Sequence, residues 1–153
     1  MSATPPAPAA PRFAATDELL PPLALYVHFP WCVSKCPYCD FNSHAVREEG
    51  LPEARYVEAL LADLDAELAW QPVALHDARR VTSVFLGGGT PSLFSPEAIG
   101  RVLEGARARL GFASDVEVTM EANPGTIERG RFAGYAAAGV NRVSLGAQSF
   151  DAA

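Results

Sequence analysis

All three cysteines of this 153-residue chain lie within eight residues of one another, at Cys32, Cys36 and Cys39. A disulfide framework spreads its cysteine pairs along a chain, whereas an odd number in one short stretch indicates a metal or redox site in a reducing compartment. Thiolates are preferred ligands of iron–sulfur clusters and of zinc. The C-x3-C-x2-C spacing therefore predicts a loop that holds one soft metal centre.

Two kinds of metal centre fit this spacing. Three cysteines can hold three irons of a [4Fe–4S] cluster and leave the fourth iron open for a ligand. Alternatively, they hold zinc together with a fourth ligand such as His28, His44 or Asp40. Zinc sites favour paired C-x2-C knuckles, and this chain has no second pair. We therefore favour the cluster, and we give little weight to cysteines that are buried without function.

A glycine run, Gly87-Gly88-Gly89, is followed by Thr90 and Pro91. Glycines let a backbone approach a ligand closely, and their amides can bind its polar groups. The structural alternative is a tight strand-to-helix turn that binds nothing. A phosphate loop is disfavoured because no Gly-Lys-Ser/Thr follows the run.

Glu121 is a carboxylate near the end of an otherwise apolar stretch. A buried carboxylate needs partners, which a ribose or a cationic ligand could supply. The structural alternative is an ion pair with Arg142.

The elements that must position these residues alternate between strands and helices. Apolar runs rich in β-formers predict strands at 23–29, 81–86, 116–122 and 142–147. Amphipathic periodicity predicts helices at 52–70, 96–110 and 128–138, the second with Ser95 as N-cap and Gly111 as C-cap. This order calls for parallel strands with helical crossovers, in a doubly wound sheet or a β/α barrel. The cysteine loop follows the first strand, at the edge where such folds bind ligands.

Charge and composition exclude several classes of protein. With 18 acidic and 12 basic residues the formal net charge is -6, which disfavours a nucleic-acid binder. There is no secretory signal and no apolar run long enough to span a bilayer, so a cytoplasmic location is expected. Residues 1–22 are rich in Pro and Ala and are expected to form a disordered tail. Because no helix follows the fourth strand, residues 23–153 are expected to be the N-terminal piece of a longer barrel.

The motifs, taken in order, resemble the radical S-adenosylmethionine (SAM) superfamily. The cysteine spacing with Tyr38 before Cys39 resembles its signature, and Gly87-Gly88-Gly89-Thr90-Pro91 resembles its glycine motif. The stretches 121–125 and 139–150 extend the resemblance to the oxygen-independent coproporphyrinogen III oxidase group. The likeness covers about residues 23–150 and implies the N-terminal part of a radical SAM β/α partial (TIM-like) barrel.

The resemblance also implies a role for each matching residue. Cys32, Cys36 and Cys39 would bind the [4Fe–4S] cluster, whose open iron chelates SAM. Reduction of the cluster then allows cleavage of SAM to a 5′-deoxyadenosyl radical. The positions that match the family's SAM contacts are Tyr26, Tyr38, Gly88, Gly89, Thr90, Glu121 and Gln148.

Within this group, residues 26–44 are most similar to the haem-chaperone (HemW) branch. The true oxidases carry a further cysteine two positions after the third cluster cysteine, where this chain has Phe41. We therefore expect a haem chaperone, with haem as its cargo. Haem ligation by His28, His44 or His76 is one hypothesis for these side chains, although an isolated histidine is usually structural. Oxidative decarboxylation of coproporphyrinogen III to protoporphyrinogen IX and a zinc-stabilised structural module are the alternatives. The expected partners are haem or a porphyrinogen, a haem-accepting protein, and an electron donor such as flavodoxin or ferredoxin.

Overall fold

The computed structural model describes residues 21–70, 79–123 and 129–151. Nearly all of the expected N-terminal tail, His76 and the expected helix start at Glu128 lie outside these residues. The main sheet consists of the parallel strands β1 (Leu23–Phe29), β4 (Val81–Gly88), β5 (Phe112–Ala122) and β6 (Arg142–Leu145). The helices are α1 (Glu53–Trp70), α2 (Pro96–Leu110) and α3 (Arg129–Ala137), with a short 3-10 helix at Pro91–Leu93.

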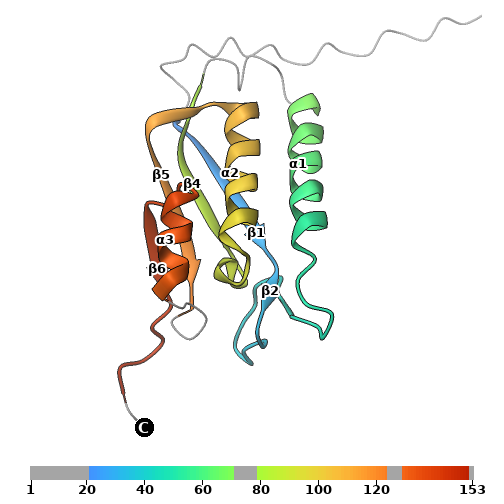
Figure 1. The fold of residues 1–153 in the computed structure, drawn as a ribbon, viewed down its shortest axis with the longest axis vertical. Coiled ribbons are helices and arrows are strands. Elements are labelled where there is room, and N and C mark those ends of the chain that lie inside the picture. The colour runs from blue at the N-terminus through green and yellow to red at the C-terminus, as the bar shows by residue number, and fades with distance from the viewer. Residues whose placement is uncertain (1–20, 71–78, 124–128, 152–153) are drawn as a thin grey trace, which may run out of the picture.

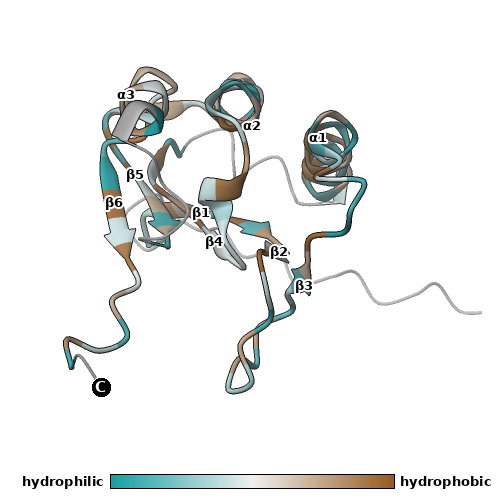
Figure 2. Ribbon diagram, turned by 60° about the horizontal axis from the view of Figure 1, so that its bottom comes forward, coloured by the Kyte–Doolittle hydropathy of each residue, from teal (hydrophilic) through white to brown (hydrophobic). Residues whose placement is uncertain are grey.

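The order of the strands distinguishes between the two expected architectures. It is β1-β4-β5-β6, so each strand of the main sheet lies beside the one before it in the chain. All three helices lie on the same face of this sheet (Figure 1 and Figure 2). A doubly wound sheet reverses direction and carries helices on both faces, whereas a β/α barrel adds its strands in one direction inside a ring of helices. The described chain is therefore an arc of barrel type, as expected.

The core lies between the sheet and the helices. Alternate strand residues such as Phe29, Leu86 and Met120 are fully buried there. The predicted apolar stripe of α2 is confirmed, since Ile99 and Val102 are buried with their neighbours along that face. Among the described residues of α1, in contrast, Val57 alone is fully buried, so this helix is the more loosely attached of the two.

Both predicted caps of α2 are confirmed. The Ser95 hydroxyl accepts a hydrogen bond from the Ala98 amide at 3.2 Å, which satisfies one free donor of the first turn. At the other end Gly111 adopts a φ of 66°, a region that favours glycine, and its amide binds the Arg107 carbonyl. The helix thus ends at Gly111, and the chain changes direction there just before β5 begins.

Three predicted strand boundaries were wrong. β4 ends at Gly88 and not at Leu86, because the strand continues into the glycine run, where Phe29 pairs with Gly88. β5 begins at Phe112 and not at Val116, because Phe112 pairs with Val81 and a shift of register accommodates the residues between. β6 ends at Leu145 and not at Ala147, because the Ala147 amide turns back to the Leu145 carbonyl at 3.0 Å. None of these three boundaries has a local signal in the pattern of apolar residues.

Candidate metal and cofactor site

The cysteine loop, residues 32–43, leaves the carboxyl end of β1 and hangs below the main sheet (Figure 1). Its two ends are joined by a two-residue parallel ladder between β2 (Trp31–Cys32) and β3 (His44–Ala45). The His44 amide binds the Pro30 carbonyl at 2.7 Å, and the Val46 amide binds the Cys32 carbonyl at 2.8 Å. This ladder, which sequence patterns did not predict, closes the base of the loop.

The base of the loop is bonded to the glycine motif. The Gly89 amide donates to the Phe29 carbonyl at 2.7 Å, and the Thr90 amide donates to the Trp31 carbonyl at 2.7 Å. A Cβ atom on Gly89 would lie only 2.6 Å from the Trp31 oxygen, so a residue with a side chain could not approach this closely. The amides of Gly89 and Thr90, which could have bound a ligand, are therefore engaged within the chain.

His28 connects the first strand, the glycine motif and the cysteine loop. Its Nε2 lies 2.8 Å from the Asn42 carbonyl, and its Nδ1 lies 3.0 Å from the Tyr26 hydroxyl. Because a carbonyl can only accept, Nε2 carries a proton, and in the neutral imidazole Nδ1 then accepts from the tyrosine. The ring also occupies the space beside Gly88, where a Cβ atom would lie 2.5 Å from its Cε1.

This arrangement revises the earlier hypotheses for His28. Both of its ring nitrogens have partners within the chain, which leaves neither for zinc or haem. Sequence reasoning missed its role as a connector. The available signal was its position two residues after Tyr26, which puts both side chains on the same face of β1.

Glu121 faces the glycine motif from β5. Its carboxylate accepts a hydrogen bond from the Gly88 amide at 3.2 Å. The alternative ion pair with Arg142 was wrong, since the Arg142 guanidinium binds Glu117 at 3.1 Å. Burial, followed by the negative charge of Glu121, raises the pKa of Tyr26 above its ordinary value, so this hydroxyl stays protonated as a donor.

The three cysteines are free thiols on the same loop. Cys36 is exposed, and Cys32 and Cys39 are half-buried. The Cys39 sulfur lies 3.8 Å from the Ser43 hydroxyl, and the Cys39 amide donates to the Cys36 carbonyl at 3.1 Å. A hydrogen bond with the Cys36 thiol raises the pKa of the Tyr38 phenol.

The chemistry of this donor set suits an iron–sulfur cluster, because three soft thiols come from one short loop. Within the part of the chain that the structure describes, no three His, Cys, Asp or Glu side chains are gathered tightly enough to hold a metal ion. The three thiols nevertheless come from one stretch of eight residues.

The remaining predicted residues differ in how closely they join this group. Thr90 is buried and precedes the 3-10 helix. Tyr38 is 70% exposed, and Phe41 is also largely exposed. Gln148 lies in the exposed segment beyond β6, with its amide nitrogen beside Gly146. The structure thus links Tyr26, Gly88 and Glu121, and leaves Tyr38 and Gln148 at the periphery.

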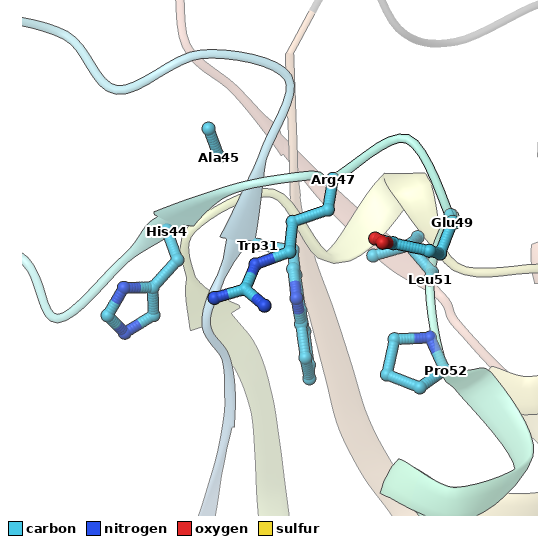
Figure 3. Close-up of a pocket in the computed structure, with 8 residues that line it drawn as sticks. Trp31, His44, Ala45, Arg47, Glu49, Leu51 and Pro52 are labelled. Carbon is cyan, nitrogen blue, oxygen red and sulfur yellow. The ribbon is translucent and has the colours of Figure 1, made fainter.

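A shallow pocket of about 530 Å³ adjoins the base of the loop on its outer side. The side chains of His44, Arg47 and Glu49 surround the Trp31 indole there (Figure 3). The other face of this region is well packed, because Trp31 meets Tyr56 edge-to-face with ring centroids 4.6 Å apart. No cysteine is among the residues that line this pocket.

The radical SAM superfamily model matches residues 26–153 of the chain. The haem chaperone HemW of Escherichia coli (strain K12) is 57% identical over 131 residues, which are 86% of this chain and 33% of that protein. A mitochondrial radical S-adenosyl methionine domain-containing protein 1 from Bos taurus is 45% identical over 84% of this chain and 27% of its own length. The chain thus spans about a third of the curated relatives it matches.

Among solved structures, coproporphyrinogen III oxidase (HemN) from Escherichia coli, a radical SAM enzyme, superposes with a TM-score of 0.73. It is 32% identical and covers 85% of this chain, which corresponds to 29% of that protein. In the described ranges 21–70, 79–123 and 129–151, no helix combines the length and apolar character needed to cross a membrane.

Proposed function

Because the chain belongs to the radical SAM superfamily, we propose that its cysteine loop binds a [4Fe–4S] cluster beside SAM and that the whole protein is a haem chaperone. Membership of the superfamily implies the cluster and SAM. One observation carries the rest of the proposal: the loop is bonded through its base to the glycine motif, at the carboxyl ends of parallel strands. The 57% identity to HemW supports haem as the cargo.

In this proposal Cys32, Cys36 and Cys39 ligate the cluster. The cluster, when reduced, supplies the electron that cleaves the S–C bond of SAM. The chain holds the ligand beside that centre. Gly88, Gly89 and Thr90 present a backbone surface without bulky side chains. Their amides are occupied, so contact with SAM would use their carbonyls.

The other proposed SAM contacts approach from three sides. Tyr26 and Glu121 lie on the uncovered face of the sheet, where they can bind polar groups of SAM. The exposed ring of Tyr38 is free to pack on an adenine, and Gln148 would approach from the end of β6. The bonds of His28 to Tyr26 and Asn42 keep the strand and the loop aligned while the ligand binds.

The alternative function is oxidative decarboxylation of coproporphyrinogen III. The superposition on HemN supports it, while Phe41 in place of a further cysteine argues against it. In either case the proposed partners are haem or a porphyrinogen and an electron donor such as flavodoxin or ferredoxin. A chaperone also needs a haem-accepting protein, in a cytoplasmic setting.

The decisive experiment begins with anaerobic reconstitution of the whole protein with iron and sulfide. The reconstituted protein is titrated with haem, and a parallel reaction supplies it with coproporphyrinogen III, SAM and a reductant. A bound cluster and stoichiometric haem binding without turnover would support the chaperone. Formation of protoporphyrinogen IX would establish the oxidase instead. Tight binding of zinc with no cluster formation would favour the structural module.

The first prediction concerns the cluster itself. Cys36→Ser is expected to abolish cluster binding, because a hydroxyl replaces one of three thiolate ligands and iron prefers sulfur. Iron and labile sulfide are measured after reconstitution and gel filtration. Ser34→Ala, in the same loop and without a ligand atom, is the control. Unchanged iron and sulfide in Cys36→Ser would contradict the assignment of that ligand.

A further inference from the structure

We propose that Lys35, the only lysine in the chain, is a positioning residue that holds the cysteine loop in the bent form from which the cluster assembles. This inference rests on the proposed function, because it concerns the cluster that Cys32, Cys36 and Cys39 would bind. It assigns no contact with SAM. The proposed role is to keep the two segments of the loop together, the one that precedes Cys36 and the one that follows Cys39.

The side chain of Lys35 bridges the loop. Its ammonium donates to the Phe41 carbonyl at 3.3 Å and to the Ser43 carbonyl at 3.4 Å. Lys35 immediately precedes Cys36, whereas the two acceptors follow Cys39. One cation therefore connects the limb that carries the second cysteine to the limb that returns to the sheet.

The segment that Lys35 holds is also held from the strand. The Asn42 carbonyl, between the two acceptors of Lys35, accepts from the His28 ring at 2.8 Å. Three consecutive carbonyls, at 41, 42 and 43, thus bind side-chain donors from Lys35 and His28. Ser43 is 2% exposed, and its hydroxyl lies 3.8 Å from the Cys39 sulfur. Fixing residues 41–43 therefore fixes the surroundings of the third cysteine.

Hydrogen bonds must stabilise the conformation of this loop, because apolar packing does not. Val33, Tyr38 and Phe41 are each more than 60% exposed. A loop with so little buried surface has little to offset the entropy of ordering its backbone. Each bond from Lys35 is long for a hydrogen bond, but both come from one charged donor, and bonds to charged groups are the stronger ones.

The charge of Lys35 matters as well as its hydrogen bonds. Gathering three thiolates around one centre concentrates negative charge on the loop. Within the described part of the chain, no ion pair joins the Lys35 ammonium to a carboxylate. Its positive charge therefore remains available to oppose that of the thiolates, and it favours the more negative, reduced form of the cluster.

Three variants of the chain test this inference. Lys35→Met keeps the length of the side chain but removes both donors and the charge. Lys35→Arg restores the charge and donors in a different geometry. Arg47→Met is the matched control, because it removes one exposed cation just beyond the loop (Figure 3). Within the described residues, the side chain of Arg47 makes no hydrogen bond or ion pair.

After anaerobic reconstitution, we expect the cluster of Lys35→Met to lose iron to a chelator on the order of tenfold faster than that of wild type, because two long hydrogen bonds from one charged donor are lost. Its midpoint potential, followed by EPR, should be more negative. Lys35→Arg should recover the potential, and Arg47→Met should match wild type. A purely structural role would not move the potential.

Hydrogen exchange of the cluster-free chain separates failure of this inference from failure of the proposed function. The amides of Cys39 and Ser43 should exchange faster in Lys35→Met than in Arg47→Met. Wild-type protein that takes up no cluster would overturn the proposed function. The exchange data would still test whether the hydrogen bonds of Lys35 hold the loop together. Equal exchange, iron retention and potential in Lys35→Met and wild type would overturn the role of Lys35.

Discussion

Two adjacent glycines at the end of β4 serve different physical purposes. Gly88 has a φ of 110°, a backbone conformation that residues with side chains rarely adopt, and it also leaves room for the His28 ring. Gly89 has no such conformation and is required because the backbone of Trp31 approaches it closely. The first glycine thus allows a turn, and the second allows the loop to bind the sheet.

Gly89→Ala is therefore expected to destabilise the fold. The new methyl group would meet backbone oxygens of Phe29 and Trp31 at 2.9 and 2.6 Å, and backbone cannot move aside as a flexible side chain can. We expect a loss of about 1–3 kcal/mol in the free energy of unfolding, measured by urea denaturation.

Gly100→Ala is the matched control for this substitution. Gly100 lies inside α2, and a Cβ atom there would meet only the Ala138 Cβ at an ordinary 3.6 Å. It should leave stability unchanged or raise it by about 0.5–1 kcal/mol, since alanine is the better helix former. Equal effects of the two substitutions would contradict the close approach at Gly89.

Among the elements, α1 depends on polar and aromatic contacts near its first turns. The Tyr56 hydroxyl donates to the His28 carbonyl at 2.6 Å, and Glu53 accepts from the Ser95 amide at 2.8 Å. Toward its other end α1 is held to α2 by the exposed pair of Arg109 and Asp65, with the guanidinium lowering the pKa of that carboxyl. The amino end of α1 is thereby attached to the same strand end as the cysteine loop.

Tyr56→Phe tests this attachment through its dependence on pH. At pH 7 the loss of one hydrogen bond should cost about 1 kcal/mol of stability. Burial, then the charge of Asp63 and the presence of Tyr26, raise the pKa of Tyr56 above the value of about 10 for an unfolded tyrosine. Above pH 10 the unfolded chain therefore loses this proton while the folded chain keeps it.

The sign of the effect follows from this difference. The stability contributed by Tyr56 is fully present below pH 10 and is lost as the pH rises through the folded pKa. The gap in unfolding free energy between wild type and Tyr56→Phe should shrink above pH 10. Urea denaturation at pH 7, 9 and 11 measures it, and a gap that stays constant to pH 11 would contradict the buried hydroxyl.

At the scale of the whole molecule, the two faces of the sheet have different environments. The helices cover one face (Figure 2), and Leu86 is fully buried in the hydrophobic core. On the other face Phe85 is 37% exposed and stacks on Tyr26, with ring centroids 6.2 Å apart. This second face also presents Glu121 and corresponds to the inner side of a barrel arc.

Two neighbouring substitutions compare these faces directly. Leu86→Asn would create a cavity and bury an amide without partners, at a cost of about 4 kcal/mol or more. Phe85→Asn should lower the free energy of unfolding by only about 1–2 kcal/mol, because the amide of the new side chain stays in contact with water. Urea denaturation and near-ultraviolet circular dichroism distinguish them. Similar costs at both positions would contradict a sheet covered on one face.

The sequence by itself determined the order of the long strands and helices, the caps of α2, the cysteine loop and the family. These features depend on residues a few positions apart, because helix and strand periods and caps are local. A cluster of cysteines at fixed spacing also carries its chemistry in the chain itself.

Tertiary structure alone decided the contacts that shape the site. The ladder that closes the loop, the bond from His28 to Asn42, the partner of Glu121 and the start of β5 all join residues distant in sequence. Such contacts depend on how strands and helices pack, and a pattern of residue types leaves several partners equally acceptable. For this reason Arg142 could be assigned to Glu121 from the sequence, while packing pairs it with Glu117.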